Sequence, residues 1–352
     1  MRRQRKRAVR PSASPSAGPS ARASVGPDAE DGTRLRAKSP ADLIGVVPYL
    51  LGFHPSESVV LLLLSERRVV MTARMDFAEL TDPRGLAGYL DEVRRGQGAV
   101  GVVTITYSRS DDAWERTAAL ADEIDPAVLV DAMLADGERW WSVLCNGSCC
   151  PPEGTPYDLG SNPLSAAAVY AGLNAMPDRS SVEALVAGPS PDDVPALELA
   201  VDEALEELIG TSVGSRKRLV RRLVQQTLDA GQPPSDVECA RLAVLVHHLH
   251  VRDVAWAQLT RERAAEHVAL WQRVVSRTPV WLASAPLCLL GISAWVAGNG
   301  TLQNCCVERV ERIDPEYSMA SLLADINQRA LPPSYWDELR REFRKHPDML
   351  AG

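Results

Sequence analysis

The sequence predicts an α/β module followed by an all-helical module, and three observations carry that prediction. Apolar runs with the composition of β-strands occur only in the first half of the chain. A turn-rich segment at 145–162 and a Pro/Gly/Ser/Asp-rich segment at 177–195 interrupt the chain after them. Beyond residue 195 the apolar residues recur at helical spacing. With 352 residues, 45% hydrophobic and 24% charged, the chain is long enough for two globular domains.

The N-terminal segment differs from the rest in charge. Residues 1–38 carry a net charge of +7, so a total of −8 leaves −15 on the remainder. Because residues 1–37 hold few apolar groups, we expect a disordered basic tail there. An acidic body disfavours general nucleic-acid binding. No apolar stretch resembles a secretory signal or a membrane span. Together with an odd number of cysteines, seven, this predicts a cytoplasmic protein with no membrane partner.

Between residues 38 and 176 the pattern predicts a mixed sheet of about five strands with helices. Ser39-Pro40 begins a helix that should kink or split at Pro48. The apolar run 58–65 reads as a strand buried on both faces. Because a helix lies between the strands 69–76 and 99–107, we expect those two strands to pair in parallel. The remaining expected elements are helices at 83–95, 111–123 and 164–174 and a hairpin formed by 128–134 and 139–144.

After a linker at 177–195, the domain 196–352 is predicted to be entirely helical. The expected helices span 196–209, 216–229, 236–257, 262–276, 285–297, 301–312, 317–328 and 334–345. Five basic residues wrap most of the second helix: Arg216, Lys217, Arg218, Arg221 and Arg222. We interpret them as a solvated surface, paired with the acidic helix at 202–207, rather than as a nucleic-acid face. His247, His250 and Asp253 have a spacing that permits metal binding, but we expect ordinary surface or partly buried histidines.

The most unusual segment places Cys145, Cys149 and Cys150 between a strand with two tryptophans and a rigid Pro-Pro-Glu-Gly turn. One interpretation is a tight turn whose thiols pack as small apolar groups. A second is a zinc site, zinc being the one cofactor that the sequence suggests, although no Cys-x-x-Cys pair is present. A third is a redox or catalytic thiol whose pKa is lowered by Arg139.

Several stretches of the chain resemble an actinobacterial family known as domain of unknown function 4192. They are Ser39-Pro-Ala-Asp-Leu43, Pro48-Tyr-Leu-Leu-Gly-Phe-His-Pro55, Ser58-Val-Val60, Arg74-Met-Asp76, Arg139-Trp-Trp-Ser142, Cys149-Cys-Pro-Pro-Glu-Gly-Thr-Pro156, Val251-Arg-Asp253, Trp295–Pro315 and Tyr317-Ser-Met-Ala320. The resemblance covers nearly the whole of the chain after the tail and implies no activity. The segment 298–315 also resembles a helix of a tetratricopeptide-type hairpin.

We therefore predict a module that binds a protein partner or a small ligand, without a recognisable catalytic constellation. The candidate binding residues are Arg139, Trp140, Trp141 and Glu153, because large amphipathic side chains at a sheet edge make good anchors. The alternative is a thiol- or zinc-dependent enzyme that uses the cysteine loop, with His54 or Glu153 as acid or base. A weaker alternative is a nucleic-acid-associated regulator that docks through 1–10 and 216–222.

Overall fold

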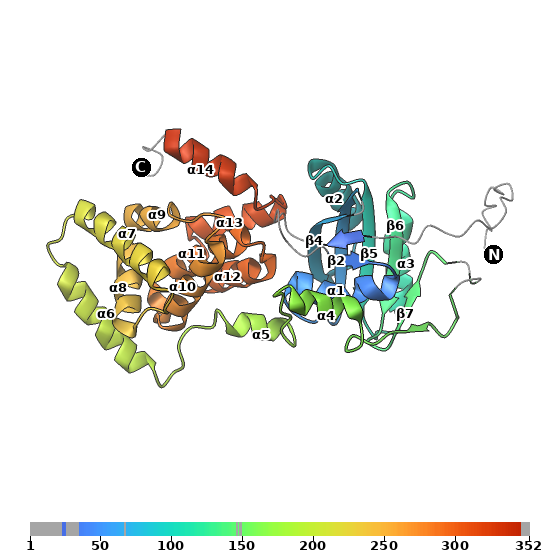
Figure 1. Ribbon diagram of the computed structural model, residues 1–352, viewed down its shortest axis with the longest axis horizontal. Helices are drawn as coiled ribbons and strands as arrows, with labels where there is room; N and C mark the ends of the chain where they lie inside the picture. Colours follow the sequence, from blue (N-terminus) through green and yellow to red (C-terminus); the bar gives the residue numbers. More distant parts are fainter. Residues whose placement is uncertain (1–22, 26–34, 67, 146, 148–149, 346–352) are drawn as a thin grey trace.

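The chain forms two regions that lie side by side (Figure 1). The computed structural model describes residues 23–25, 35–66, 68–145, 147 and 150–345. A sheet region contains every strand and ends near residue 176, and a helical region spans 179–345. This confirms the predicted order of an α/β module followed by an all-helical one.

The sheet has eight strands in the order β2-β1-β4-β3-β5-β6-β7-β8. The five expected strands form its middle, from β4 to β7. Two short strands, β1 and β2, extend one edge, although they fall in the stretch expected to be a disordered tail. The bounds are Ala23–Val25 (β1), Leu35–Ala37 (β2), Ser58–Ser65 (β3), Arg68–Asp76 (β4), Gly101–Tyr107 (β5), Leu129–Ala135 (β6), Arg139–Ser142 (β7) and Thr155–Pro156 (β8).

The pairing expected between β4 and β5 is wrong. The two strands run in the same direction, but β3 lies between them and pairs antiparallel with both. Residues 58–64 of β3 are all buried, as a strand covered on both faces and flanked on both sides should be. The parallel neighbour of β5 is β6, the next strand along the chain.

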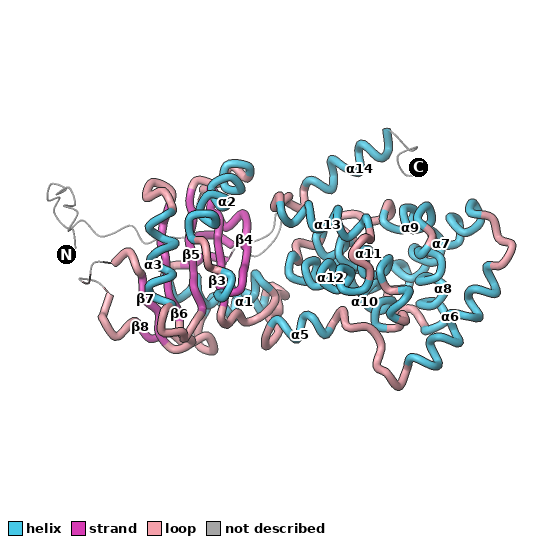
Figure 2. The backbone as a smooth tube through the Cα atoms, turned by 180° about the vertical axis from the view of Figure 1, so that it is seen from behind, coloured by secondary structure: helices cyan, strands magenta, loops and turns pink. Residues whose placement is uncertain are grey.

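Helices cover both faces of the sheet, and β3 supplies side chains to each. Its even-numbered residues Val60, Leu62 and Leu64 join one apolar core, and Val59, Leu61 and Leu63 join another. Helices α1 (Pro40–Leu51) and α4 (Pro163–Tyr170) cover the first face and lie in front in Figure 1. Helices α2 (Pro83–Gly96) and α3 (Ala113–Glu123) cover the second and face the viewer in Figure 2.

Helix α1 continues through Pro48 as a single helix and is not split. A proline inside a helix leaves the carbonyl four residues earlier, here that of Ile44, without its backbone donor. The hydroxyl of Tyr107 on β5 donates to that carbonyl at 3.0 Å. A buried side chain of the sheet therefore supplies the hydrogen bond that the proline removes.

The helical region consists of packed helix pairs, and no strand follows β8 in the described part of the chain. The bounds are Arg179–Ala184 (α5), Val194–Leu208 (α6), Val213–Ala230 (α7), Asp236–His247 (α8), Leu249–Trp256 (α9), Ala264–Ser276 (α10), Ser284–Val296 (α11), Gly300–Ile313 (α12), Ser318–Gln328 (α13) and Tyr335–Lys345 (α14). The helix expected at 236–257 is two helices, because the backbone at His248 is extended. Helix α5 lies within the segment 177–195 and contacts α12 through the Arg179–Glu308 ion pair.

Hydrogen bonds from side chains join the two regions. On α2, the Tyr89 hydroxyl donates to the Gln328 carbonyl at 3.0 Å. The side chain of Gln97, which follows α2, donates to the Ala330 carbonyl at 2.6 Å. The Thr301 hydroxyl of α12 donates to the Leu51 carbonyl at the end of α1, at 2.7 Å. The core on the α1 and α4 side continues into the helical region as one apolar cluster. Among the described helices none is long and apolar enough to traverse a bilayer.

Candidate functional site

The corner that follows β7 is held together by two of the predicted binding residues. Arg139 donates from Nη1 to the carbonyls of Glu153 and Gly154, at 3.2 and 2.8 Å. The indole Nε1 of Trp141 donates to the Pro152 carbonyl at 3.1 Å. Gly154 has a φ of +82°, and a Cβ there would lie 2.4 Å from Cε2 of the Trp141 ring. The turn is therefore clamped onto β7, and only glycine fits at its tip.

The other two predicted residues have different surroundings. Trp140 packs against the apolar core on the α1 and α4 face, and its Nε1 is buried without a hydrogen-bond partner among the described residues. The side chain of Glu153 is exposed to solvent. The structure thus places Trp140 and Trp141 on opposite faces of the sheet, with Arg139 and Trp141 supporting the loop and Glu153 exposed on it.

Cys145 and Cys150 of the same loop are partly exposed, and Cys149 lies outside the described residues. Within the described ranges, no group of three or more His, Cys, Asp or Glu side chains is placed to hold a metal ion. The histidine spacing noted above assumes one continuous helix, and the break at His248 removes that condition. His54 follows α1, where its ring meets that of Tyr49 edge-on.

A buried ion pair in the helical region accounts for another family-like stretch. Arg252 donates from Nε and Nη2 to Asp253 Oδ1, at 3.2 and 3.0 Å. Its Nη1 donates to the Tyr317 hydroxyl at 3.1 Å. Burial raises the pKa of Tyr317, which stays a neutral donor and acceptor there. This network links α9 to the start of α13, so its residues serve packing.

A further group of family-like residues supports the end of β4. Arg74 donates from Nε to the buried Ser58 hydroxyl at 2.9 Å and forms an ion pair with Asp76. Its guanidinium lies 5.9 Å from the centre of the Phe53 ring. These contacts fix the strand β4 against β3 and against the segment that follows α1.

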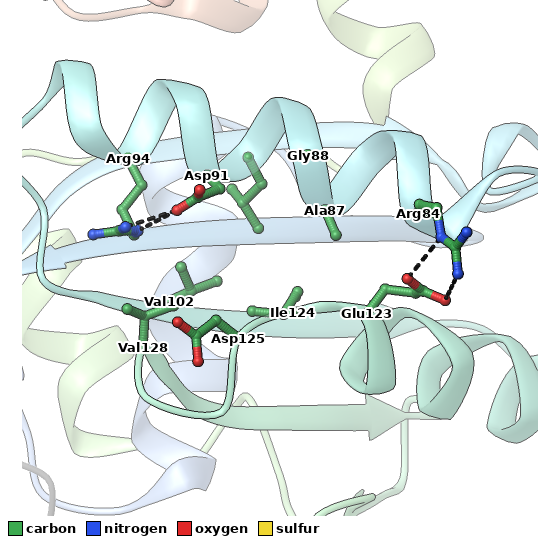
Figure 3. Close-up of a pocket in the computed structure, with 11 residues that line it drawn as sticks. Arg84, Ala87, Gly88, Asp91, Arg94, Val102, Glu123, Ile124, Asp125 and Val128 are labelled. Carbon is green, nitrogen blue, oxygen red and sulfur yellow. Dashed lines mark hydrogen bonds and ion pairs between the residues drawn. The ribbon is translucent and has the colours of Figure 1, made fainter.

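A groove of about 270 Å³ lies between α2 and the turn that follows α3 (Figure 3). We call it the α2–α3 groove. Helix α2 forms one wall, and the turn from α3 into β6 forms the other. The apolar residues that line it are Ala87, Leu90, Val102, Ile124 and Val128. A mostly apolar concavity with a few polar groups is the usual form of a small-ligand site.

Charged residues stand around this apolar lining. At one end Arg84 and Glu123 form an ion pair of 3.1 Å that joins α2 to α3. At the other end Asp91 accepts hydrogen bonds from Arg94 and Arg95, and these bonds lower its pKa. Asp125 uses Oδ1 to accept from the Ala127 amide at 2.9 Å. Its second carboxylate oxygen has no partner among the described residues.

The sequence did not point to this groove, because each of its apolar residues reads as ordinary core. The groove lies between α2 and the turn from α3 into β6, and a local sequence pattern does not show that these separate segments meet. One signal was available. Gly88 lies in the middle of α2, where glycine is unfavourable, and a Cβ there would meet nothing within 4 Å. Gly88 has no positive φ, so its backbone does not require glycine. The missing side chain leaves open space beside the groove instead.

Comparison with known proteins gives one match. The model of the family described as "Domain of unknown function (DUF4192)" matches residues 40–334. No curated protein and no solved structure matches the chain. Because the match covers the sheet region from α1 onward and the helical region as far as α14, the chain belongs to the DUF4192 family.

Proposed function

We propose that the protein binds a compact small molecule in the α2–α3 groove. The observation that carries this proposal is that apolar and charged residues line the same groove. An apolar ligand body would contact Leu90, Ile124 and Val128. Leu90 and Ile124 are already 4% and 5% exposed, so most of the apolar surface that a ligand could still remove from water here belongs to Val128. A volume of about 270 Å³ limits the ligand to a small molecule or a single side chain.

The charges around the groove favour a ligand that carries a positive or hydrogen-bond-donating group. The lining contains two arginines and three carboxylates, Asp91, Glu123 and Asp125. Asp91 and Glu123 are engaged by arginines, so Asp125 is the carboxylate with capacity to accept a further donor. We infer a primary amine on a short aliphatic or aromatic body as the ligand class.

The proposal is tested by screening small amines, with carboxylates and alcohols of the same carbon skeletons, by saturation-transfer NMR against the full chain. We expect the amines to bind and the Gly88→Leu variant to lose them, because the new side chain fills the groove. Gly96→Leu is the matched control, since Gly96 lies on the same helix and does not line the groove. Asp125→Asn keeps an acceptor for Ala127 and should weaken amine binding about tenfold.

Two results would contradict the groove as the site: undiminished binding by Gly88→Leu, or a preference for the carboxylates. A second candidate surface is the clamped turn after β7, because hydrogen bonds to its main-chain carbonyls hold the backbone that carries the exposed Glu153 side chain. Glu153→Gln belongs in the same screen for that reason. Loss of binding in that variant, with Gly88→Leu unaffected, would assign the ligand to the turn.

A further inference from the structure

Helices α6 and α7 lie at the end of the helical region farthest from the sheet (Figure 1). Helix α6 packs against α8, and α7 packs against α9. Each of the two helices also has a face that no described residue covers. The chemistry of these two faces is opposite.

The uncovered face of α6 combines apolar and acidic side chains. Leu197, Val201, Ala204 and Leu208 are its buried residues. On the other side Leu199 is 62% exposed, and Ile209, directly after the helix, is 77% exposed. Leu205 and the carboxylates of Asp202, Glu203 and Glu206 are exposed between them. Exposed apolar side chains among carboxylates indicate a surface that associates with another molecule. We call it the acidic face.

The uncovered face of α7 is basic. Arg216 points back to the end of α6, where it donates to the Leu208 carbonyl at 2.8 Å and to the Thr211 hydroxyl at 2.9 Å. With Arg216 removed from the cluster, the other four basic residues no longer wrap the helix. Arg218, Arg221 and Arg222 are exposed and lie on one side of the helix. Lys217 is half-buried, because it lies on the same stripe of the helix as the buried Val220 and Val224. We call the side formed by Arg218, Arg221 and Arg222 the basic face.

These charges are not neutralised within the chain. Among the described residues, Lys217, Arg221 and Arg222 have no carboxylate partner, and Arg218 bonds only to the Ser215 hydroxyl. The expected pairing of this cluster with the helix at 202–207 is wrong, because Glu207 pairs with Arg241 of α8. Elsewhere in the helical region arginines such as Arg263 and Arg277 bind carboxylates.

We propose that the two faces bind each other between two copies of the chain. The acidic face of one copy lies against the basic face of the other, and a two-fold axis repeats the contact. A two-fold interface requires a surface that is complementary to itself, and neighbouring faces of opposite charge satisfy that requirement. Such a dimer also covers Leu199, Leu205 and Ile209. A polyanion such as nucleic acid fits less well, because the chain beyond residue 38 carries −15.

The first test is the mass of the full chain by sedimentation velocity over a range of micromolar concentrations. We expect a monomer–dimer equilibrium that weakens as salt rises, since the contacts between the faces are electrostatic and at the surface. Reversing the basic face with Arg221→Glu and Arg222→Glu should raise the dissociation constant at least about tenfold. Reversing the acidic face with Glu203→Lys and Glu206→Lys should do the same. All four positions are exposed, so circular dichroism of both variants should match that of the parent.

The decisive test mixes the two charge-reversed variants. Each variant repels itself at both contacts, but in the mixed pair both contacts again join opposite charges. The mixture should therefore regain the dimer that neither variant forms alone. A parent chain that stays monomeric at every concentration would overturn the proposal, as would a mixture that stays monomeric. Binding of a DNA duplex by the monomer, lost in the basic-face variant, would assign that face to nucleic acid instead.

Discussion

The sheet region and the helical region differ in how they place their cysteines. Cys145 and Cys150 of the sheet region lie in a partly exposed loop, whereas the four cysteines of the helical region, Cys239, Cys288, Cys305 and Cys306, are buried. Tryptophan does not separate the two regions in this way: Trp336 is fully buried beside Trp256 and Trp295, but Trp281 is 54% exposed and Trp114 of α3 is 44% exposed. The contrast between the regions therefore concerns their cysteines.

The largest contrast should appear in thiol reactivity. Burial raises the pKa of Cys239 and Cys288 to about 12 and that of Cys305 to about 11. At pH 8 this lowers the thiolate fraction by roughly a hundredfold or more, and the sulfurs are also inaccessible. Iodoacetamide should therefore label Cys145 and Cys150 in the native protein. Peptide mass spectrometry should find the helical-region thiols labelled only after denaturation. If Cys288 were labelled in the native protein as fast as Cys145, the predicted difference in thiol reactivity between the two regions would be wrong.

A second difference concerns His267 of α10, which is 1% exposed. Burial, followed by the charge of Arg263, lowers its pKa to about 4. In the unfolded chain His267 binds a proton near pH 6.5, whereas in the folded chain it does so only near pH 4. The stability that depends on neutral His267 is therefore fully present above pH 6.5 and is lost as the pH falls toward 4. The loss is on the order of 3 kcal/mol. Urea unfolding of the parent should therefore show a steeper decline in stability between pH 6.5 and 4 than unfolding of His267→Phe.

The exposed His247 supplies the control for that experiment. His247→Phe replaces an exposed side chain and leaves the buried His267 in place, so its slope should match that of the parent. The hydrogen bond with Arg277 is the main cause that lowers the pKa of Asp236. Protonation of such carboxylates in acid destabilises the parent and every variant alike. Only the difference between the slopes therefore measures His267. Equal slopes in all three proteins would show that its ring is solvated.

The smallest effect should come from the clamped turn of the sheet region. Gly154 and Gly147 both have positive φ, +82° and +91°, so alanine at either position adds strain of about 1 kcal/mol. Only at Gly154 does the new methyl group also meet the Trp141 ring. Gly154→Ala should therefore destabilise by about 1–3 kcal/mol more than Gly147→Ala and should accelerate labelling of Cys150. Identical behaviour of the two variants would show that the turn is not clamped.

The positions of helices and strands were easier to predict from the sequence than which elements lie side by side in the structure. The capping box of Ser235 and Glu238 at the start of α8 is present, as is the hydroxyl cap of Ser39 on α1. An alternating pattern shows which faces of a strand are buried and leaves its partner undetermined, so β3 was not placed between β4 and β5. The end of α8 at His248 has no glycine or proline to signal it. The strand β2 has only three residues, too few for a periodic pattern.

The candidate site was less predictable. The residues of the clamped corner were identified from their composition, and the structure shows which of them hold the loop. The α2–α3 groove depends on how α2 lies against the turn that follows α3, and only the three-dimensional arrangement contains that information. The basic face of α7 was obscured by Arg216, whose side chain turns away to the end of α6, and by the half-buried Lys217.

Helix α2 both lines the groove and contacts the helical region. It forms a wall of the groove, and the Tyr89 hydroxyl on α2 and the Gln97 side chain just beyond it bind main-chain oxygens at the end of α13. A molecule that pushed this wall outward would have to carry those two anchors with it or break them. Binding of a molecule in the groove would then strain the two hydrogen bonds that connect α2 to the helical region. Because such coupling is reciprocal, a shift in the position of α13 would alter the affinity of the groove for its ligand.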